Sequence, residues 1–368
     1  MLGAYSFRGL DAEHIGYGAM VARFVEVLED RVELRDDAEN VVFGLMPNMI
    51  RGWFRGQHTA CMTMWETDTP PPLFRRFLPQ FDKVLVPSTF SRDLFAEFNN
   101  DIAVVPLGID RTVWKPSGVP TGRFRFITAG SSWPRKGIQQ VIDAFHAADV
   151  DAELIVKLPD WVAEDPGVTD GGPNVTIMRE RLSVNDEVAL YRSADCFVSG
   201  SRGEGFGLIP LQNVAVGNIV IAPGHTGHSD FAHLFDYNLS WRTEPSRMQK
   251  WPDTGNWFVP DFDEMVDAMR DAFERGRLHW ASRQKRWRST AGWTWEDATD
   301  VLLDKFPAGG VLAKQDFVEL ALPVEVLALR NVYADIGRHR IRAGKGDRLT
   351  VPASTVQQLL DSGLVQEL

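Results

Sequence analysis

The feature that most constrains this chain is an alternation of strand and helix patterns that occurs twice along the sequence. Short apolar runs alternate with helical patterns over the first third, and the same rhythm begins again near Arg123. Strands that alternate with helices are typical of βαβ units, which build parallel sheets. A stretch rich in Pro and Gly, WKPSGVPTG at 114–122, separates the halves as a linker would. We therefore predict an α/β fold of two Rossmann-like, doubly wound parallel-sheet domains in tandem.

These breaks predict three parts of the chain. Residues 1–117 form an N-terminal Rossmann-like domain, and residues 118–308 form a second one. Residues 309–368 form a small appended unit with a β-rich pattern and one short helix. Tryptophans in the second half are interpreted as core and interdomain packing rather than as a platform for stacking sugars. They are Trp241, Trp251, Trp257, Trp280, Trp287, Trp293 and Trp295.

Composition excludes several classes of protein. No run of 18 or more apolar residues is present, and the first residues lack a signal-peptide pattern, so we expect neither a membrane span nor export. Cys61 and Cys196 lie far apart within apolar segments, which favours buried free thiols and a cytoplasmic location. The net charge of −11 argues against extensive wrapping of nucleic acid, although local basic clusters remain able to bind phosphate.

The loop RGEGFG at 202–207 lies between a predicted strand and a predicted helix. In open α/β sheets, ligands bind at the carboxyl ends of strands, where such loops are found. Its glycines allow close backbone approach, and the helix N-terminus favours an anion or a group rich in hydroxyls. Glu204 then accepts hydrogen bonds from those hydroxyls. The alternative is that Glu204 caps the helix and the glycines only form a turn.

A second loop of this type follows the strand FRFITAG, which ends at Gly130. It places Arg135 and Lys136 at a predicted helix start, where cations are unfavourable unless an anion compensates them. A phosphate group is one such anion; a solvated pair of basic residues is the alternative. One loop that binds phosphate and another that binds hydroxyls match a nucleotide sugar.

These motifs resemble a known family. The chain resembles retaining glycosyltransferases of the GT-B fold, family 4 in particular, over roughly residues 40–300. The resemblance rests on PLGIDRTVWKP at 106–116, RKG at 135–137, SADCFVSGS at 193–201 and the block that continues to Asn218. The resemblance implies that the two domains face each other across a cleft and that the last long helix, WTWEDATDVLLDKF, crosses back onto the N-terminal domain. It also implies that chemistry needs no metal and that the anomeric configuration is retained.

The resemblance assigns roles residue by residue. Arg135 and Lys136 would neutralise the donor diphosphate, and Glu204, the first Glu of a Glu-x7-Glu motif, would hold hydroxyls of the transferred sugar. The second Glu of that motif is Gln212 here, and an amide grips a diol less symmetrically than a carboxylate does; Gln212 as a plain polar residue on a helix face is the alternative. The expected donor-binding residues are Gly130, Gly205, Phe206, Gly207, Leu208, Gln212, Gly16 and Gly18.

The N-terminal half is expected to bind the acceptor. Gly16 and Gly18 follow the first strand and open a helix, so their amides either face the donor phosphates or form a plain helix entry. Glu66 and Asp68 follow a strand and are candidates for the acceptor side of the cleft, as is His58, for which a structural role is the alternative. The loop GHTGHSD at 224–230 is interpreted as a turn anchored by Asp230 rather than as a wall of the donor pocket.

The resulting hypothesis is an enzyme that transfers a hexose from a nucleoside diphosphate sugar, with no tightly bound cofactor, to an acceptor hydroxyl. The C-terminal segment resembles small accessory segments of bacteriophage proteins, which suggests phage-encoded modification of hydroxymethylated DNA bases in the host cytoplasm. A bacterial glycan, lipid or protein acceptor is the alternative, and a non-catalytic sugar-nucleotide-binding protein is a third reading. The basic residues behind the DNA hypothesis are Arg330, Arg338, Arg340, Arg342, Lys345, Arg348, Arg51, Arg55, Arg75 and Arg76.

Overall fold

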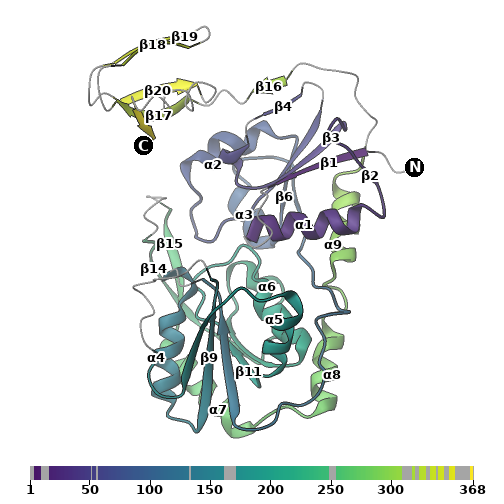
Figure 1. Ribbon diagram of the computed structural model, residues 1–368, viewed down its shortest axis with the longest axis vertical. Helices are drawn as coiled ribbons and strands as arrows, with labels where there is room; N and C mark the ends of the chain where they lie inside the picture. The colour runs from purple at the N-terminus through teal and green to yellow at the C-terminus, as the bar shows by residue number, and fades with distance from the viewer. Residues whose placement is uncertain are drawn as a thin grey trace.

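The structure is a computed structural model of the 368-residue chain. It describes residues 4–9, 16–50, 52–54, 57–131, 134–160, 171–247 and 254–308, together with short strands beyond residue 316. Two α/β lobes lie one above the other, and the C-terminal strands lie beyond the first lobe (Figure 1). The predicted α/β fold with two parallel-sheet domains is confirmed.

The N-terminal sheet has six parallel strands in the order β2-β1-β3-β5-β6-β7. They are β1 (Ala4–Gly9), β2 (Glu33–Leu34), β3 (Asn40–Gly44), β5 (His58–Met62), β6 (Lys83–Val86) and β7 (Ile102–Val104). Helices α1 (Gly16–Leu28), α2 (Pro72–Phe77) and α3 (Thr89–Phe95) belong to this lobe. Every residue of β3 is buried, as expected for a parallel strand covered on both faces.

The C-terminal sheet also has six parallel strands, in the order β10-β9-β8-β11-β12-β13. They are β8 (Phe124–Ala129), β9 (Ala152–Leu158), β10 (Val175–Arg179), β11 (Cys196–Val198), β12 (Ile219–Pro223) and β13 (Tyr237–Leu239). Its helices are α4 (Ile138–Ala148), α5 (Val184–Arg192), α6 (Leu208–Val216) and α7 (Phe262–Arg275). The strand order reverses between β8 and β11, which is where open α/β sheets bind ligands.

The last helices return the chain to the first lobe. Helix α8 (Trp280–Ser289) leads to α9 (Trp295–Lys305), which begins at a capping box formed by Thr294 and Asp297 and lies beside α1 (Figure 1). Trp295 packs edge-on against Phe24 of α1, with ring centroids 5.4 Å apart. Helix α9 therefore packs against the first lobe. Helix α8 was not predicted, because its sequence lacks a clear apolar stripe and Arg283 is its one fully buried side chain.

Shorter elements complete the described part. Strands β14 (Trp241–Pro245) and β15 (Asn256–Pro260) form an antiparallel ribbon, and β4 (Gly52–Phe54) pairs with β16 (Phe317–Glu319). The appended segment contributes β17 (Pro323–Ala328), β18 (Val332–Ile336), β19 (His339–Ala343), β20 (Arg348–Pro352) and β21 (Val365–Glu367). Its β-rich character agrees with the sequence, whereas the short helix expected there falls outside the described residues. The predicted domain limits at 117 and 308 stay predictions.

Both cysteines are free and fully buried, at 0% exposure each, as predicted.

Candidate active site

The loops after β8 and β11 meet at the reversal point of the C-terminal sheet. The Arg202 amide donates to the Arg135 carbonyl at 2.7 Å, which links the two loops directly. Gly137 has φ +61°, and a Cβ there would lie 2.0 Å from the Gly200 carbonyl oxygen. Only a glycine therefore allows the loops to approach so closely. Arg135 and Lys136 precede α4 on a separate 3-10 turn, Pro134–Lys136, rather than starting the helix itself.

Glu204 joins the two loops through charge. Lys136 Nζ lies 2.6 Å from Glu204 Oε1, and Arg135 Nη1 lies 3.3 Å from Glu204 Oε2. The Ser201 hydroxyl also donates to Glu204 Oε1 at 2.6 Å. The N-cap of α6 is Gly207, so Glu204 does not cap the helix. Among the described residues, Glu204 forms an ion pair with both cations, whereas Glu66 pairs with Arg135 alone, at 3.6 Å.

Burial and charge oppose each other in this cluster. Burial alone would raise the pKa of Glu204, but Lys136 and Arg135 outweigh it, so the carboxyl pKa lies well below its ordinary value. For Arg135, burial works toward a lower pKa, and the attraction of Glu66 and Glu204 overcomes it to raise the pKa. For Lys136, burial outweighs the attraction of Glu204 and lowers the pKa of the ammonium group. Glu204 is therefore ionised at neutral pH in a largely buried corner beside two basic side chains.

The N-terminus of α6 presents unpaired backbone amides to this corner. The amides of Phe206, Gly207 and Leu208 have no hydrogen-bond partner among the described residues. Gly207 has φ +95°, and a Cβ there would lie 2.2 Å from His228 Nε2. The fully buried Phe206 ring packs against Phe231 and fixes the loop from behind. Free amides, a helix N-terminus and two cations together favour a polyanionic ligand.

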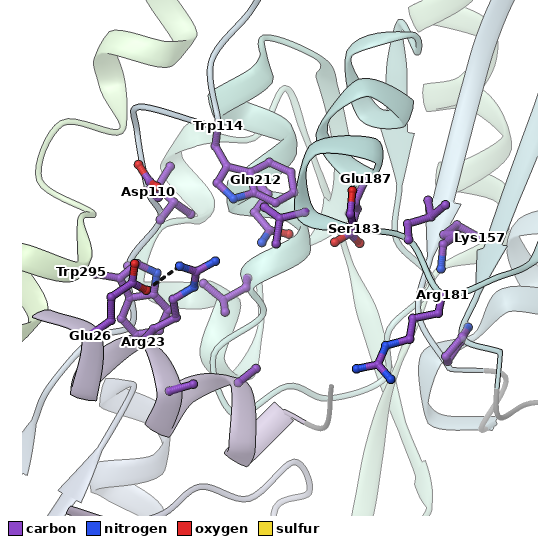
Figure 2. A pocket seen from close by; sticks show the side chains of 18 of the residues that line it. Arg23, Glu26, Asp110, Trp114, Lys157, Arg181, Ser183, Glu187, Gln212 and Trp295 are labelled. Carbon is purple, nitrogen blue, oxygen red and sulfur yellow. Dashed lines mark hydrogen bonds and ion pairs between the residues drawn. The ribbon is translucent and has the colours of Figure 1, made fainter. Parts of the chain in front are cut away.

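A cavity of about 920 Å³ begins beside the first turn of α6 and lies between the two lobes. Leu208 and Gln212 line it from α6, and α1 of the N-terminal lobe lines it from the other side (Figure 2). The lining residues that carry charge are Arg23, Glu26, Glu29, Asp110, Lys157, Asp160, Glu180, Arg181 and Glu187. None of these was singled out from the sequence, because their convergence depends on how the lobes pack.

The start of α1 lies near the same corner, where Met64 links it to the Glu204 loop. The Tyr17 hydroxyl donates to the Met64 carbonyl at 3.1 Å, and a Cβ on Gly205 would lie 2.4 Å from Met64 Sδ. Gly16 has open space around it. The helix N-terminus of the first lobe is thus placed near the loop that holds Glu204, and Gly130 lies beside the Lys136 side chain.

The acceptor candidates separate in the structure. Glu66 belongs to the corner, since it faces Arg135 and its carbonyl would clash with a Cβ on Gly203 at 1.8 Å. Asp68 instead accepts from the backbone and side-chain nitrogens of Asn256, at 2.7 and 2.8 Å, and so joins the lobes. His58 lies at the amino end of β5, away from the ligand-binding edge of the sheet.

His58 has structural partners there. Its ring stacks on Phe306 with centroids 4.5 Å apart, and its Nδ1 lies 3.4 Å from Asn40 Oδ1. These contacts match the structural alternative considered for this histidine.

The loop at 224–230 packs behind the corner. The Glu204 amide donates to the Thr226 hydroxyl at 3.0 Å, and the His228 ring lies against Gly207. Burial, with a contribution from His228, lowers the pKa of His225 to about 3, and burial also lowers the pKa of His228, so both rings are neutral at pH 7. Asp230 accepts from the Thr89 amide at 2.8 Å and thus ties the loop to the N-terminal lobe.

The tryptophans mostly pack, as predicted. Trp257 and Trp295 are buried, and Trp293 contacts Phe206 and Phe231, whereas Trp241 and Trp280 are exposed. Trp251 falls outside the described residues. Within the described part of the chain, no set of three or more His, Cys, Asp or Glu side chains is arranged to hold a metal ion. Nor do the described helices include one with the length and apolarity needed to cross a bilayer.

Comparison with solved structures identifies the fold as GT-B. Structures similar to this chain include sucrose-phosphate synthase from Thermosynechococcus elongatus (TM-score 0.58, 13% identity, covering 83% of this chain and 98% of that one). Another is Anabaena Alr3699/HepE in complex with UDP (TM-score 0.60, 13% identity, 82% and 98%). A third is WaaG, a glycosyltransferase involved in lipopolysaccharide biosynthesis (TM-score 0.56, 14% identity, 84% and 100%).

Sequence similarity points in the same direction. D-inositol 3-phosphate glycosyltransferase of Arthrobacter sp. (strain FB24) is 27% identical over 244 residues, covering 59% of this chain and 56% of the relative. Alpha-monoglucosyldiacylglycerol synthase of Streptococcus pneumoniae (strain ATCC BAA-255 / R6) is 29% identical over 185 residues, covering 42% and 40%. The chain spans about half the length, or less, of these curated relatives. No protein-family model matches the sequence.

Proposed function

We propose that the protein is a glycosyltransferase that moves a hexose from a nucleoside diphosphate sugar to an acceptor hydroxyl. The observation that carries this proposal is the meeting of Lys136, Arg135 and Glu204 beside the free amides of α6, at the edge of an interdomain cavity. Similarity to two proteins named for glycosyl transfer or glycolipid synthesis supports it, as does a structural neighbour solved with UDP and glucose.

The proposed reaction breaks the bond between the anomeric carbon and the diphosphate oxygen. Lys136 and Arg135 pair with the diphosphate in place of Glu204, and the first amides of α6 donate hydrogen bonds to it. Both stabilise the negative charge that develops on the leaving diphosphate. Glu204, released from Lys136, accepts hydrogen bonds from hydroxyls of the transferred sugar. The acceptor oxygen then bonds to the anomeric carbon, and its proton passes to the departing phosphate oxygen. We propose retention of configuration and metal-independent chemistry on the basis of the motif resemblance.

For the acceptor, the proposal has two forms. One proposed acceptor is a hydroxymethylated base in phage DNA, which the basic C-terminal segment suggests. The other is a glycan, lipid or protein, which the names of the curated relatives suggest. We propose action in the cytoplasm, where nucleotide sugars and free thiols are both found.

The test has two stages. The protein is incubated with a panel of UDP, GDP, ADP and dTDP sugars, and release of nucleoside diphosphate is measured. Mass spectrometry then follows the selected donor with hydroxymethyl-containing DNA, glycan and lipid acceptors. Turnover of any donor supports the enzyme. A donor that binds but is consumed with none of the acceptors would instead favour a non-catalytic sugar-nucleotide-binding protein.

A further inference from the structure

The interdomain cavity continues along α6 from the anion-binding corner. Leu208 opens the helix, and Gln212 lies four residues on, about one turn or 6 Å further along the same face. A ribose attached to a diphosphate at the start of α6 would lie about that far from the phosphates. The ribose of a bound donor would therefore lie at the level of Gln212.

Gln212 alone is a poor partner for the two neighbouring hydroxyls of a ribose. Both hydroxyls can donate hydrogen bonds, but an amide side chain offers a single acceptor oxygen, whereas a carboxylate offers two. A ribose site at this position therefore needs a second acceptor. The structure supplies a candidate on the neighbouring helix α5, which packs against α6.

That candidate is Glu187, which lines the same cavity as Gln212 (Figure 2). The Tyr191 hydroxyl donates to Glu187 Oε1 at 3.0 Å and holds the carboxylate in place. Tyr191 is fully buried, and burial together with Glu187 raises its pKa well above the ordinary value, so it remains a donor at neutral pH.

The second oxygen of Glu187 is available to a ligand. Oε2 has no hydrogen-bond or ion-pair partner among the described residues. Lys157 also lines the cavity and is a cation near Glu187. Its ammonium group donates to the carbonyls of Leu158 and Glu180, at 3.1 and 2.9 Å, rather than to Glu187. A carboxyl group with one oxygen held by Tyr191 and the other without a partner among the described residues can accept a hydrogen bond from a ligand hydroxyl.

We propose that Glu187 is a specificity-determining residue that, with Gln212, accepts hydrogen bonds from the ribose hydroxyls of the donor nucleotide. The site then prefers ribonucleoside diphosphates over their 2′-deoxy counterparts. This inference rests on the proposed function, because it assumes that a nucleoside diphosphate occupies the cavity. It assigns to a carboxylate on α5 a role that the sequence motif alone would leave to Gln212.

The test measures dissociation constants by calorimetry for UDP, GDP and their 2′-deoxy forms. In the unaltered protein, the preferred ribonucleotide is expected to bind about ten-fold more tightly than its deoxy form. Glu187→Gln is expected to reduce this ratio to less than two-fold while leaving deoxy binding nearly unchanged. The ratio is the decisive readout, because a merely structural disturbance weakens both nucleotides equally. Glu274→Gln, an exposed change of the same kind on α7, serves as the matched control and keeps the original ratio.

A rescue variant strengthens the test. Glu187→Gln combined with Gln212→Glu returns a carboxylate to the site and is expected to restore most of the ratio. Tyr191→Phe, which releases the anchored oxygen, is expected to lower it about three-fold and provides a second variant if Glu187→Gln fails to fold.

The outcomes separate the two proposals. An unchanged ratio in Glu187→Gln, or an equal loss for both nucleotides, overturns the role of Glu187 and leaves the proposed function intact. Absence of binding by every nucleoside diphosphate to the unaltered protein overturns the proposed function, and this inference with it.

Discussion

The two sheets share an architecture but differ in what lies beside the point where each strand order reverses. In the C-terminal sheet the loops after β8 and β11 carry Arg135, Lys136 and Glu204, three charges in one buried corner. In the N-terminal sheet the order reverses between β1 and β3, and the helix that follows β1 opens with Gly16-Tyr17-Gly18 and no charge. The same fold thus provides two equivalent positions, and among the described residues, which omit 10–15 between β1 and α1, the charged cluster lies at the C-terminal one.

The N-terminal lobe contributes one carboxylate to the corner, Glu66, which lies 3.6 Å from Arg135; its other contacts there are neutral or tether the lobes. The Ser88 hydroxyl donates to the Gly205 carbonyl at 2.7 Å, and Asp68 and Asp230 each accept bonds across the lobes. These contacts hold the charged loop against the first lobe. On the proposed function, this difference leads us to expect that donor binding depends mainly on the C-terminal loops, whereas the N-terminal lobe positions them.

The largest expected effect comes from Glu204→Gln. The change removes the negative charge that pairs with Lys136 and Arg135 and replaces one of the two hydrogen-bond-accepting oxygens by an NH2 donor, so transfer should fall about 1000-fold. The free energy of unfolding should fall by about 3 kcal/mol, because Lys136 and Arg135 would remain largely buried without the carboxylate that compensates their desolvation. Steady-state kinetics and urea unfolding measure the two effects. Comparable transfer rates in the variant and the unaltered protein would remove Glu204 from the reaction.

The same carboxylate predicts a pH dependence of stability. Its pKa in the folded protein lies below the unfolded value, so its contribution is complete above about pH 4.5 and is lost as pH falls further. The stability difference between the unaltered protein and Glu204→Gln should therefore narrow between pH 5 and pH 3, as measured by urea unfolding. A difference that stays constant across this range would argue against the ion pair.

Lys136→Ala is expected to have the next largest effect. Loss of one charge-assisted contact to the diphosphate should weaken nucleoside diphosphate binding about 100-fold by calorimetry. Lys285→Ala, an exposed lysine on α8, is the matched control and should leave affinity unchanged. Unchanged affinity in Lys136→Ala would exclude Lys136 from the phosphate site.

Both lobes and the two charged loops could be predicted from sequence, because alternating strands and helices and glycine-flanked charges are local patterns. The pairing of Lys136 with Glu204 could not, since the residues are 68 positions apart and meet only through the strand order. Likewise, the sequence suggests that Asp68 belongs to the site. In the structure, however, both of its carboxylate oxygens accept hydrogen bonds from Asn256 of the other lobe. The cavity residue Glu187 lies in an ordinary helical pattern that gives no local signal.

Asp68→Ala tests the tethering role of the N-terminal lobe. Loss of its bonds to Asn256 should cost about 1–2 kcal/mol of unfolding free energy and reduce transfer by less than about five-fold. Thermal unfolding and kinetics provide the measurements. A loss of transfer as large as that of Glu204→Gln would show that Asp68 belongs to the reacting site.

His58→Ala should have the smallest effect. Its stacking on Phe306 predicts a cost of about 1 kcal/mol in stability, with transfer changed by less than about two-fold. A selective loss of transfer at unchanged melting temperature would return His58 to the acceptor site.

The central claim is that the corner formed by Arg135, Lys136, Glu204 and the first amides of α6 holds the donor diphosphate. A crystal structure with the nucleoside diphosphate selected by calorimetry tests it most directly. We predict phosphate oxygens within hydrogen-bonding distance of Lys136 Nζ and of the Gly207 or Leu208 amide, with the Lys136–Glu204 contact lengthened beyond 2.6 Å. A nucleotide bound elsewhere, with that ion pair intact, would contradict the account.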